Sequence, residues 1–355
     1  VNVEVLSLNN LIEQDIVTNQ RSVILKPTGL CNANCKFCYA SNFSENCKSI
    51  ENFDTKFKNY IESKQIKNVI LTGGEITLVP KFLEEICSYA DENNISISLV
   101  SNMIEILKNV EYWQDFFKRH EKLHLTASYQ TDNQRSNFMG EKISEIDFVN
   151  FARWYREELN KRLLVISVVN DENENKILEN IYLAKECKYV SSIERQIGIG
   201  RAKYEYSPLK YFKLLNKIID MDMWQYEKHL RLLVQSGMFG VHYCNFYCKQ
   251  MVPVIYIDKN ENLIETFCDH LSTTKFSYED FIAEKDIKKE CAFCKYRNLC
   301  QACHITRKNI NSQIANGQID ISIYCEELKN ELKKLENNIL QIRGKNGTEL
   351  SYKLD

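Results

Sequence analysis

Clustered cysteines constrain this protein more than any other feature of its sequence. The 355-residue chain has 14 cysteines; three of them, Cys31, Cys35 and Cys38, fall within one short segment, and another group lies between Cys244 and Cys325. We expect no export signal, because the first residues lack a positive segment followed by an apolar core. Tight clusters of thiols without such a signal favour metal ligation in a reducing compartment over disulfides. The sequence therefore predicts a metal site towards each end of the chain.

Apolar, β-rich runs alternate with amphipathic helical patterns between residues 22 and 200. The runs are SVILKP, NVILTGG, ISISLVS, LHLTAS, LLVISVV and IERQIGIG. Strands that alternate with helices predict βα units and a parallel sheet. Six strands fall short of the eight in a closed TIM barrel. The expected fold class is therefore α/β, with a partial (βα)6 TIM-like barrel followed by a small cysteine-rich domain.

Changes of pattern along the chain predict four parts. We expect residues 1–207 to form the barrel and residues 208–240, which read as LKYFKLLNKIIDM and WQYEKHLRLLVQSG, to form a helical bridge. Residues 241–340 have only short apolar runs such as VPVIYID, which is typical of a small domain whose core is supplemented by metal. A last helix, EELKNELKKLENNILQI, precedes a polar tail at residues 341–355.

Charge and hydropathy exclude some partners. The formal net charge is -2, with acidic and basic residues mixed, so no basic face indicates nucleic acid. Nor does any stretch approach the roughly 18 apolar residues of a membrane span. We therefore expect a cytoplasmic protein that binds neither nucleic acid nor a membrane.

The first three cysteines directly follow the first predicted strand, in the segment CNANCKFC. They are expected on a loop at the carboxyl edge of the sheet, where active sites of parallel α/β folds gather. A cubane with four irons normally takes four thiolates, so three leave one iron open to a substrate. The alternative is a zinc knuckle with another ligand, such as Cys47.

This segment resembles the CxxxCxφC signature of the radical SAM superfamily, with Phe37 as its aromatic residue. The resemblance implies that Cys31, Cys35 and Cys38 hold a 4Fe-4S cluster whose open iron binds S-adenosyl-L-methionine. Reductive cleavage of that molecule would give a 5'-deoxyadenosyl radical. The cofactor would supply the difficult chemistry, and the protein positioning and shielding.

A second motif, Thr-Gly-Gly-Glu, closes the second predicted strand. Gly73 and Gly74 let the backbone approach a ligand closely, and the Glu75 carboxylate can bind an ammonium group. The motif resembles the GGEP element of the same superfamily, although Ile76 replaces the proline. The resemblance implies that it holds the methionyl amino group.

Polar residues also end the third and fourth predicted strands. By the resemblance, Ser101, Asn102 and Ser128 would meet the ribose and methionine carboxylate, and the IGIG segment at residues 197–200 resembles a diffuse adenine-contacting motif. The alternative for the polar residues is ordinary strand-end turn chemistry.

Eight cysteines towards the carboxyl end are enough to ligate two further 4Fe-4S clusters fully. Their arrangement resembles the SPASM extension of radical SAM proteins, although one spacing is a residue shorter. The resemblance assigns Cys244, Cys248, Cys268 and Cys303 to a nearer auxiliary cluster. It assigns Cys291, Cys294, Cys300 and Cys325 to a farther one, giving three 4Fe-4S clusters in all. Two structural zinc sites are the alternative.

SPASM proteins largely modify peptides and proteins, so the interpretation is a maturase that crosslinks or oxidises a side chain of a peptide or protein substrate. An external electron donor such as flavodoxin or ferredoxin is implied. Asp269 directly follows Cys268, a position that sulfatase-maturing enzymes use for a base, although it could also cap a turn. The alternatives are a radical SAM enzyme with a small-molecule substrate and a non-enzymatic iron-sulfur or zinc protein. Cys47, Cys87 and Cys187 match no ligand position, and Cys87 is expected in the core.

Overall fold

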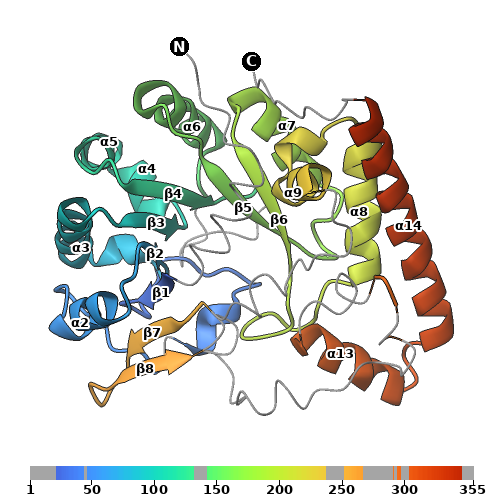
Figure 1. Cartoon of the computed structure of the whole chain (residues 1–355), viewed down its shortest axis with the longest axis horizontal. Helices are drawn as coiled ribbons and strands as arrows, with labels where there is room; N and C mark the ends of the chain where they lie inside the picture. The colour runs from blue at the N-terminus through green and yellow to red at the C-terminus, as the bar shows by residue number, and fades with distance from the viewer. Residues whose placement is uncertain are drawn as a thin grey trace.

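A computed structural model describes most of the chain (Figure 1). The described residues are 21–43, 46–131, 142–236, 252–266, 291, 294–296 and 304–345. No helix within these ranges is long and apolar enough to cross a membrane.

The centre of the molecule is a parallel β-sheet whose first six strands neighbour one another in chain order (Figure 1). Each of them pairs in parallel with the next, so their carboxyl ends lie along one edge. The strands are β1 (Ser22–Lys26), β2 (Asn68–Leu71), β3 (Ser96–Ser101), β4 (Leu123–Ser128), β5 (Leu164–Val169) and β6 (Val190–Arg195). The α/β class and the parallel six-stranded sheet of a partial barrel are therefore confirmed.

Helices cover the outer face of this sheet. They are α2 (Thr55–Ser63), α3 (Pro80–Asn93), α4 (Ile104–Lys108), α5 (Val110–Arg119), α6 (Glu145–Leu159) and α7 (Ile177–Cys187). Local chemistry sets their ends: α3 begins with a proline and stops at Asn94 in the left-handed conformation, and the Ser144 hydroxyl accepts a hydrogen bond from the Asp147 amide at the start of α6. Their apolar faces meet the strands in one continuous core, in which Phe82 and Phe148 are completely buried.

The sixth strand differs from its prediction. It covers Val190–Arg195, whereas the sequence placed it over IERQIGIG at residues 193–200. The reason is that the Gln196 side chain donates to the carbonyl of Tyr204 at 2.8 Å, and Gly200 has a positive φ of 66°. These residues therefore form a loop that folds back on itself after the strand.

A hairpin from the carboxyl half of the chain extends the same sheet. It consists of β7 (Val254–Ile257), which pairs in parallel with β1, and β8 (Leu263–Thr266), which is antiparallel to β7. In the turn, the Asp258 carboxylate accepts hydrogen bonds from the amides of Asn260 and Asn262. The sequence placed VPVIYID in a separate small domain, but in the structure this strand belongs to the barrel sheet. It lies there because Val254, Ile255 and Ile257 are buried against β1.

Four helices pack at the other end of the sheet, beyond β6 (Figure 1). They are α8 (Pro208–Asp220), α9 (Lys228–Ser236), α13 (His304–Ala315) and α14 (Ile321–Lys345). Residues of α8, α9 and α14 share a second apolar core with Val169 of β5 and Ile193 of the edge strand β6. The two helical runs predicted after residue 208 are confirmed as α8 and α9, and the predicted last helix is confirmed within the longer α14.

A buried group of charges fastens α9 to β6. The Glu227 carboxylate, fully buried, accepts hydrogen bonds from the amides of Leu230 at 2.7 Å and Ile193 at 3.3 Å, and so caps the helix. The Nδ1 of His229 lies 2.8 Å from Glu227, and its Nε2 lies 3.4 Å from Glu194. Burial by itself lowers the pKa of His229, but the two carboxylates outweigh it and raise the pKa to about 9.

We expect this group to make stability fall in mildly alkaline solution. The pKa of His229 is raised above its unfolded value, so the stabilisation is complete below about pH 6.5 and is lost as the pH rises through about 9. The loss should be on the order of 3 kcal/mol. Urea unfolding at a series of pH values measures it. His229→Gln should flatten that part of the profile; an unchanged slope in the variant would assign the pH dependence to other groups.

Candidate functional site

The cysteine loop, residues 27–43, leaves the carboxyl end of β1 and carries Cys31, Cys35 and Cys38. All three are free thiols; Cys35 is buried and the other two are half-buried. The segment turns tightly, because the amide of Cys38 donates to the carbonyl of Cys35 at 3.3 Å and the amide of Ala33 donates to the Sγ of Cys31 at 3.4 Å. The aromatic ring of Phe37 is buried in the same small cluster as Cys35 and Ile104.

The electrostatics of these thiols fit a metal cluster. The pKa of Cys31 is raised to about 11, mainly by burial. The hydrogen bond from the Ala33 amide opposes this rise, and the neighbouring Glu75, Cys35 and Cys38 contribute to it. Three thiolates so close together would be unfavourable unless bound cations compensated their charge, and a coordinating metal deprotonates thiols outright. Among the described residues no three Cys, His, Asp or Glu side chains converge on one ion. A cubane does not require such convergence, because each thiolate binds its own iron.

The two glycines after β2 pack against the cysteine loop. The amide of Gly74 donates to the carbonyl of Thr28 at 2.9 Å, and the amide of Glu75 donates to that of Leu30 at 2.6 Å. A Cβ atom at Gly74 would lie 1.9 Å from the Leu30 carbonyl oxygen, and one at Gly73 would lie 2.4 Å from that of Thr28. In the structure the chain's own loop needs this space. The close approach of these glycines to a ligand stays a prediction.

The Glu75 carboxylate joins the ends of β2 and β3. It is almost completely buried and accepts hydrogen bonds from the Thr77 hydroxyl at 2.7 Å, the Ser101 hydroxyl at 2.9 Å and the Asn102 amide at 2.7 Å, with a longer one from the Thr77 amide. Burial raises the pKa of Glu75, whereas these hydrogen bonds favour its charged form. Glu75 therefore fixes the edge of the sheet on which the cysteine loop rests.

Asn102 continues the connection from this edge to the cysteines. The side-chain Nδ2 of Asn102 donates to the Oδ1 of Asn32 at 2.7 Å and lies 3.7 Å from the Sγ of Cys31. The side-chain Oδ1 of Asn102 accepts from the backbone amide of Ile104. Asn32 in turn donates to Glu105 at 3.0 Å. The side chain of Asn102 is thus engaged within the protein. Ser128, at the end of β4, lies at the same edge of the sheet and is half-buried.

The loop after β6 contacts the cysteine loop at its other end, around Cys38 and Tyr39. A Cβ atom at Gly200 would lie 2.5 Å from the carbonyl oxygen of Cys38 and 2.6 Å from that of Tyr39, so only glycine fits there. The amide of Arg201 donates to the same Cys38 carbonyl at 3.0 Å, and its side chain donates to Asn34. The IGIG segment therefore lies at the candidate site, but here too its glycine contacts backbone of the chain itself.

Three other cysteines lie away from this cluster. The Cys47 thiol donates to the carbonyls of Lys26 and Lys48, and burial raises its pKa to about 12. Cys87 and Cys187 are buried in the main core, as predicted for Cys87. The Cys47 thiol therefore bonds to backbone carbonyls and does not join the three loop cysteines.

Part of the carboxyl-terminal cysteine group lies in the described residues. Cys291 and Cys294 form a turn in which the amide of Cys294 donates to the carbonyl of Cys291, and Cys325 lies in the first turns of α14. The adjoining Tyr296 donates to Glu336 of α14 at 2.7 Å, which fastens this turn to the helix. All three cysteines are free and half-buried. Asp269 lies outside the described residues. So do the remaining predicted ligands, which are Cys244, Cys248, Cys268, Cys300 and Cys303.

Some residues of the site were not predicted from the sequence. The Thr28 hydroxyl accepts from the amide of Leu30 at 3.0 Å and lies 2.7 Å from the hydroxyl of Ser49, so it sets the entry of the cysteine loop. The only local signal for it is a threonine before glycine in KPTGLC, which suits a turn. Asn32, Asn34 and Arg201 hold the loop through contacts distant in the chain, which the sequence does not indicate.

Comparison with known proteins gives a family match and a fold match. Residues 25–183 match the family model of the Radical SAM superfamily. The fold resembles native anSMEcpe with bound AdoMet and Cp18Cys peptide, at 15% identity over 92% of this chain and 99% of that one, with a TM-score of 0.66. It also resembles Streptococcus suis SuiB bound to the precursor peptide SuiA, at 14% identity over 84% of this chain and 74% of that one, with a TM-score of 0.56. No curated protein matches the sequence.

We predict that Gly74→Ala lowers the iron content of the anaerobically reconstituted protein. The new methyl group would force the Leu30 carbonyl, and with it the cysteine loop, away from β2. The loss of stability should be at least about 2 kcal/mol, measured by urea unfolding alongside iron analysis. Gly344→Ala is the matched control, because nothing lies within 4 Å of a Cβ atom there. Full iron content in Gly74→Ala would show that the loop does not depend on this contact.

Proposed function

We propose that this chain, which belongs to the radical SAM superfamily through residues 25–183, cleaves S-adenosylmethionine reductively and modifies a side chain of a peptide or protein. The observation that carries the proposal is the cysteine loop itself. Its three free thiols are held between the glycine turn after β2 and the loop after β6. A protein that only carries electrons would need no cluster with an open iron, because four thiolates per cluster serve that purpose.

Cys31, Cys35 and Cys38 would hold the 4Fe-4S cluster. Such a cluster would supply the electron for reductive cleavage of S-adenosylmethionine. The chain contributes position and shielding. The loop cannot retreat from the sheet without breaking the hydrogen bonds that Gly74 and Glu75 donate to it. Phe37 and Ile104 exclude water from the side of the loop that faces the protein.

The strand ends beside the loop would receive S-adenosylmethionine. We propose that its methionine and ribose groups bind at the strand ends that carry Gly73, Gly74, Glu75, Ser101, Asn102 and Ser128. The Glu75 carboxylate already accepts hydrogen bonds from the Ser101 hydroxyl and the Asn102 backbone amide at the end of β3. It would therefore be a rigid acceptor for an ammonium group. The side chain of Asn102 would act through the loop, because its donors are directed at Asn32 and Cys31.

A peptide or protein substrate is supported by the fold alone. The two similar structures were solved with a Cp18Cys peptide and with a precursor peptide, and this chain shares their architecture over most of its length. An external donor such as flavodoxin or ferredoxin would supply the electron. A small-molecule substrate is the competing proposal, and it predicts that no peptide stimulates the cleavage.

Two auxiliary 4Fe-4S clusters are part of the proposal. The turn of Cys291 and Cys294 is fastened to α14, the helix that carries Cys325, and this supports a shared site for these three residues. Cys300 would complete that cluster. Cys244, Cys248, Cys268 and Cys303 would hold the other, with Asp269 beside it as the proposed base.

We predict about twelve irons per chain after anaerobic reconstitution, and about eight in the variant with Cys31, Cys35 and Cys38 changed to alanine. That variant should form no 5'-deoxyadenosine with dithionite and S-adenosylmethionine. Iron analysis and chromatography of the products measure the two quantities.

Cys47→Ala is the control for cysteine removal, because this buried thiol donates to backbone carbonyls and is separate from the loop cysteines. It should keep the iron content and the cleavage. Zinc in place of iron, or cleavage that persists without the three loop cysteines, would refute the proposed function.

A further inference from the structure

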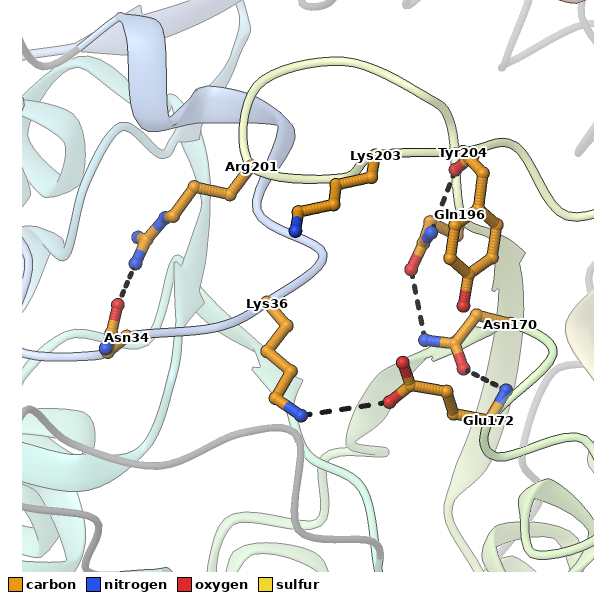
Figure 2. Close-up of a pocket in the computed structure, with 8 residues that line it drawn as sticks. All are labelled: Asn34, Lys36, Asn170, Glu172, Gln196, Arg201, Lys203 and Tyr204. Atoms are coloured by element: carbon orange, nitrogen blue, oxygen red, sulfur yellow. Dashed lines mark hydrogen bonds and ion pairs between the residues drawn. The ribbon is translucent and has the colours of Figure 1, made fainter.

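A pocket of about 470 Å³, lined by charged and polar residues and Tyr204, opens beside the cysteine loop (Figure 2). Asn34 and Lys36, the two neighbours of Cys35, form one wall. The loops after β5 and β6 form the other walls. The pocket therefore lies at the carboxyl edge of the sheet, where the proposed chemistry would take place, but none of the residues assigned above to S-adenosylmethionine lines it.

The floor of the pocket is rigid. Asn170 and Gln196 are buried there, and the Nδ2 of Asn170 donates to the Oε1 of Gln196 at 3.0 Å. Gln196 also donates to the Tyr204 carbonyl, and Asn170 accepts from the amide of Glu172 at 3.0 Å. Their hydrogen-bonding groups are thus directed at one another and at backbone, which leaves recognition to the rim.

The rim is mainly positive. It contains Lys36, Lys203 and Arg201 against the single carboxylate of Glu172. Lys36 and Glu172 lie 3.9 Å apart with side chains 75% and 56% exposed, so their attraction is weak and water competes for both. Figure 2 shows Lys36, Lys203 and Glu172 around the same space.

Arg201 carries a donor that lacks an acceptor. Its guanidinium group binds Asn34, yet its Nε is buried and has no hydrogen-bond partner among the residues that the structure describes. A buried donor without an acceptor is costly, so this end of the Arg201 side chain is held under some strain. Arginine is well suited to a carboxylate or a phosphate, because its donors form a planar fork.

We propose that this pocket binds the carboxylate of an acidic residue in the peptide substrate. The carboxylate would lie between Lys36 and Lys203, and the nearby guanidinium group of Arg201 would add positive charge to the rim. The inference rests on the proposed function, since it names the kind of peptide that the enzyme modifies. Glu172 favours a singly charged carboxylate over phosphate, because its own negative charge repels a dianion more strongly. An acidic residue held here would bring its neighbours in the peptide next to the cysteine loop.

The test uses the reconstituted full-length enzyme and two fluorescein-labelled peptides, (Gly-Glu)5 and (Gly-Gln)5. Fluorescence anisotropy should show tighter binding of the glutamate peptide, with an affinity that falls as salt is added. Lys203→Glu should weaken that binding by roughly tenfold, because it replaces an attraction with a repulsion. Lys213→Glu makes an equal charge change at an exposed position of α8 and should leave the binding of the glutamate peptide unchanged.

Three outcomes would overturn the pocket assignment. They are equal binding of both peptides, equal loss in the two variants, and displacement of the glutamate peptide by inorganic phosphate at matched ionic strength. Binding of S-adenosylmethionine is measured on the same samples; its loss in Lys203→Glu would instead assign the pocket to the cofactor. Cleavage without any peptide tests the proposed function separately, so the two ideas can fail independently.

Discussion

The structure of the site depends on one close backbone contact, between the glycine turn after β2 and the start of the cysteine loop. The Glu75 amide lies 2.6 Å from the Leu30 carbonyl oxygen, and no side chain fits at Gly74. A loop that carries three cysteines has little regular structure of its own, so it must be held by the strands beside it. This contact fixes the loop at the carboxyl edge of the sheet, and the contact at Gly200 fixes it from the other side.

Buried polar groups extend that constraint across the barrel mouth. Glu75 is stable in the interior because several donors surround its carboxylate, and one of these donors is the backbone of Asn102. Asn102 then reaches the Asn32 side chain and the Cys31 sulfur. The residues that the sequence suggested as cofactor contacts thus also organise the loop. Such an arrangement preorganises a site before its ligands bind, which is what reactive chemistry requires.

Charge is distributed differently at two places along the carboxyl edge of the sheet. Around β2 and β3 a buried carboxylate dominates, whereas around β5 and β6 the pocket rim has three cations and one carboxylate. The first is where we propose that the ammonium group of a cofactor binds, and the second is where we propose that an anionic group of the substrate binds. The same cysteine loop joins both regions, because Cys31 faces one and the neighbours of Cys35 face the other.

The sequence by itself determined the parallel α/β sheet and the cysteine loop, because strand and helix periodicity and thiol spacing are local properties. It also placed Glu75 and Ser101 at strand ends. Only the tertiary structure decided that the β7 hairpin joins the barrel sheet, that Gly74 serves the loop, and that Lys36 and Arg201 line one pocket. These depend on contacts between segments far apart in the chain, and no local pattern records which segments will meet.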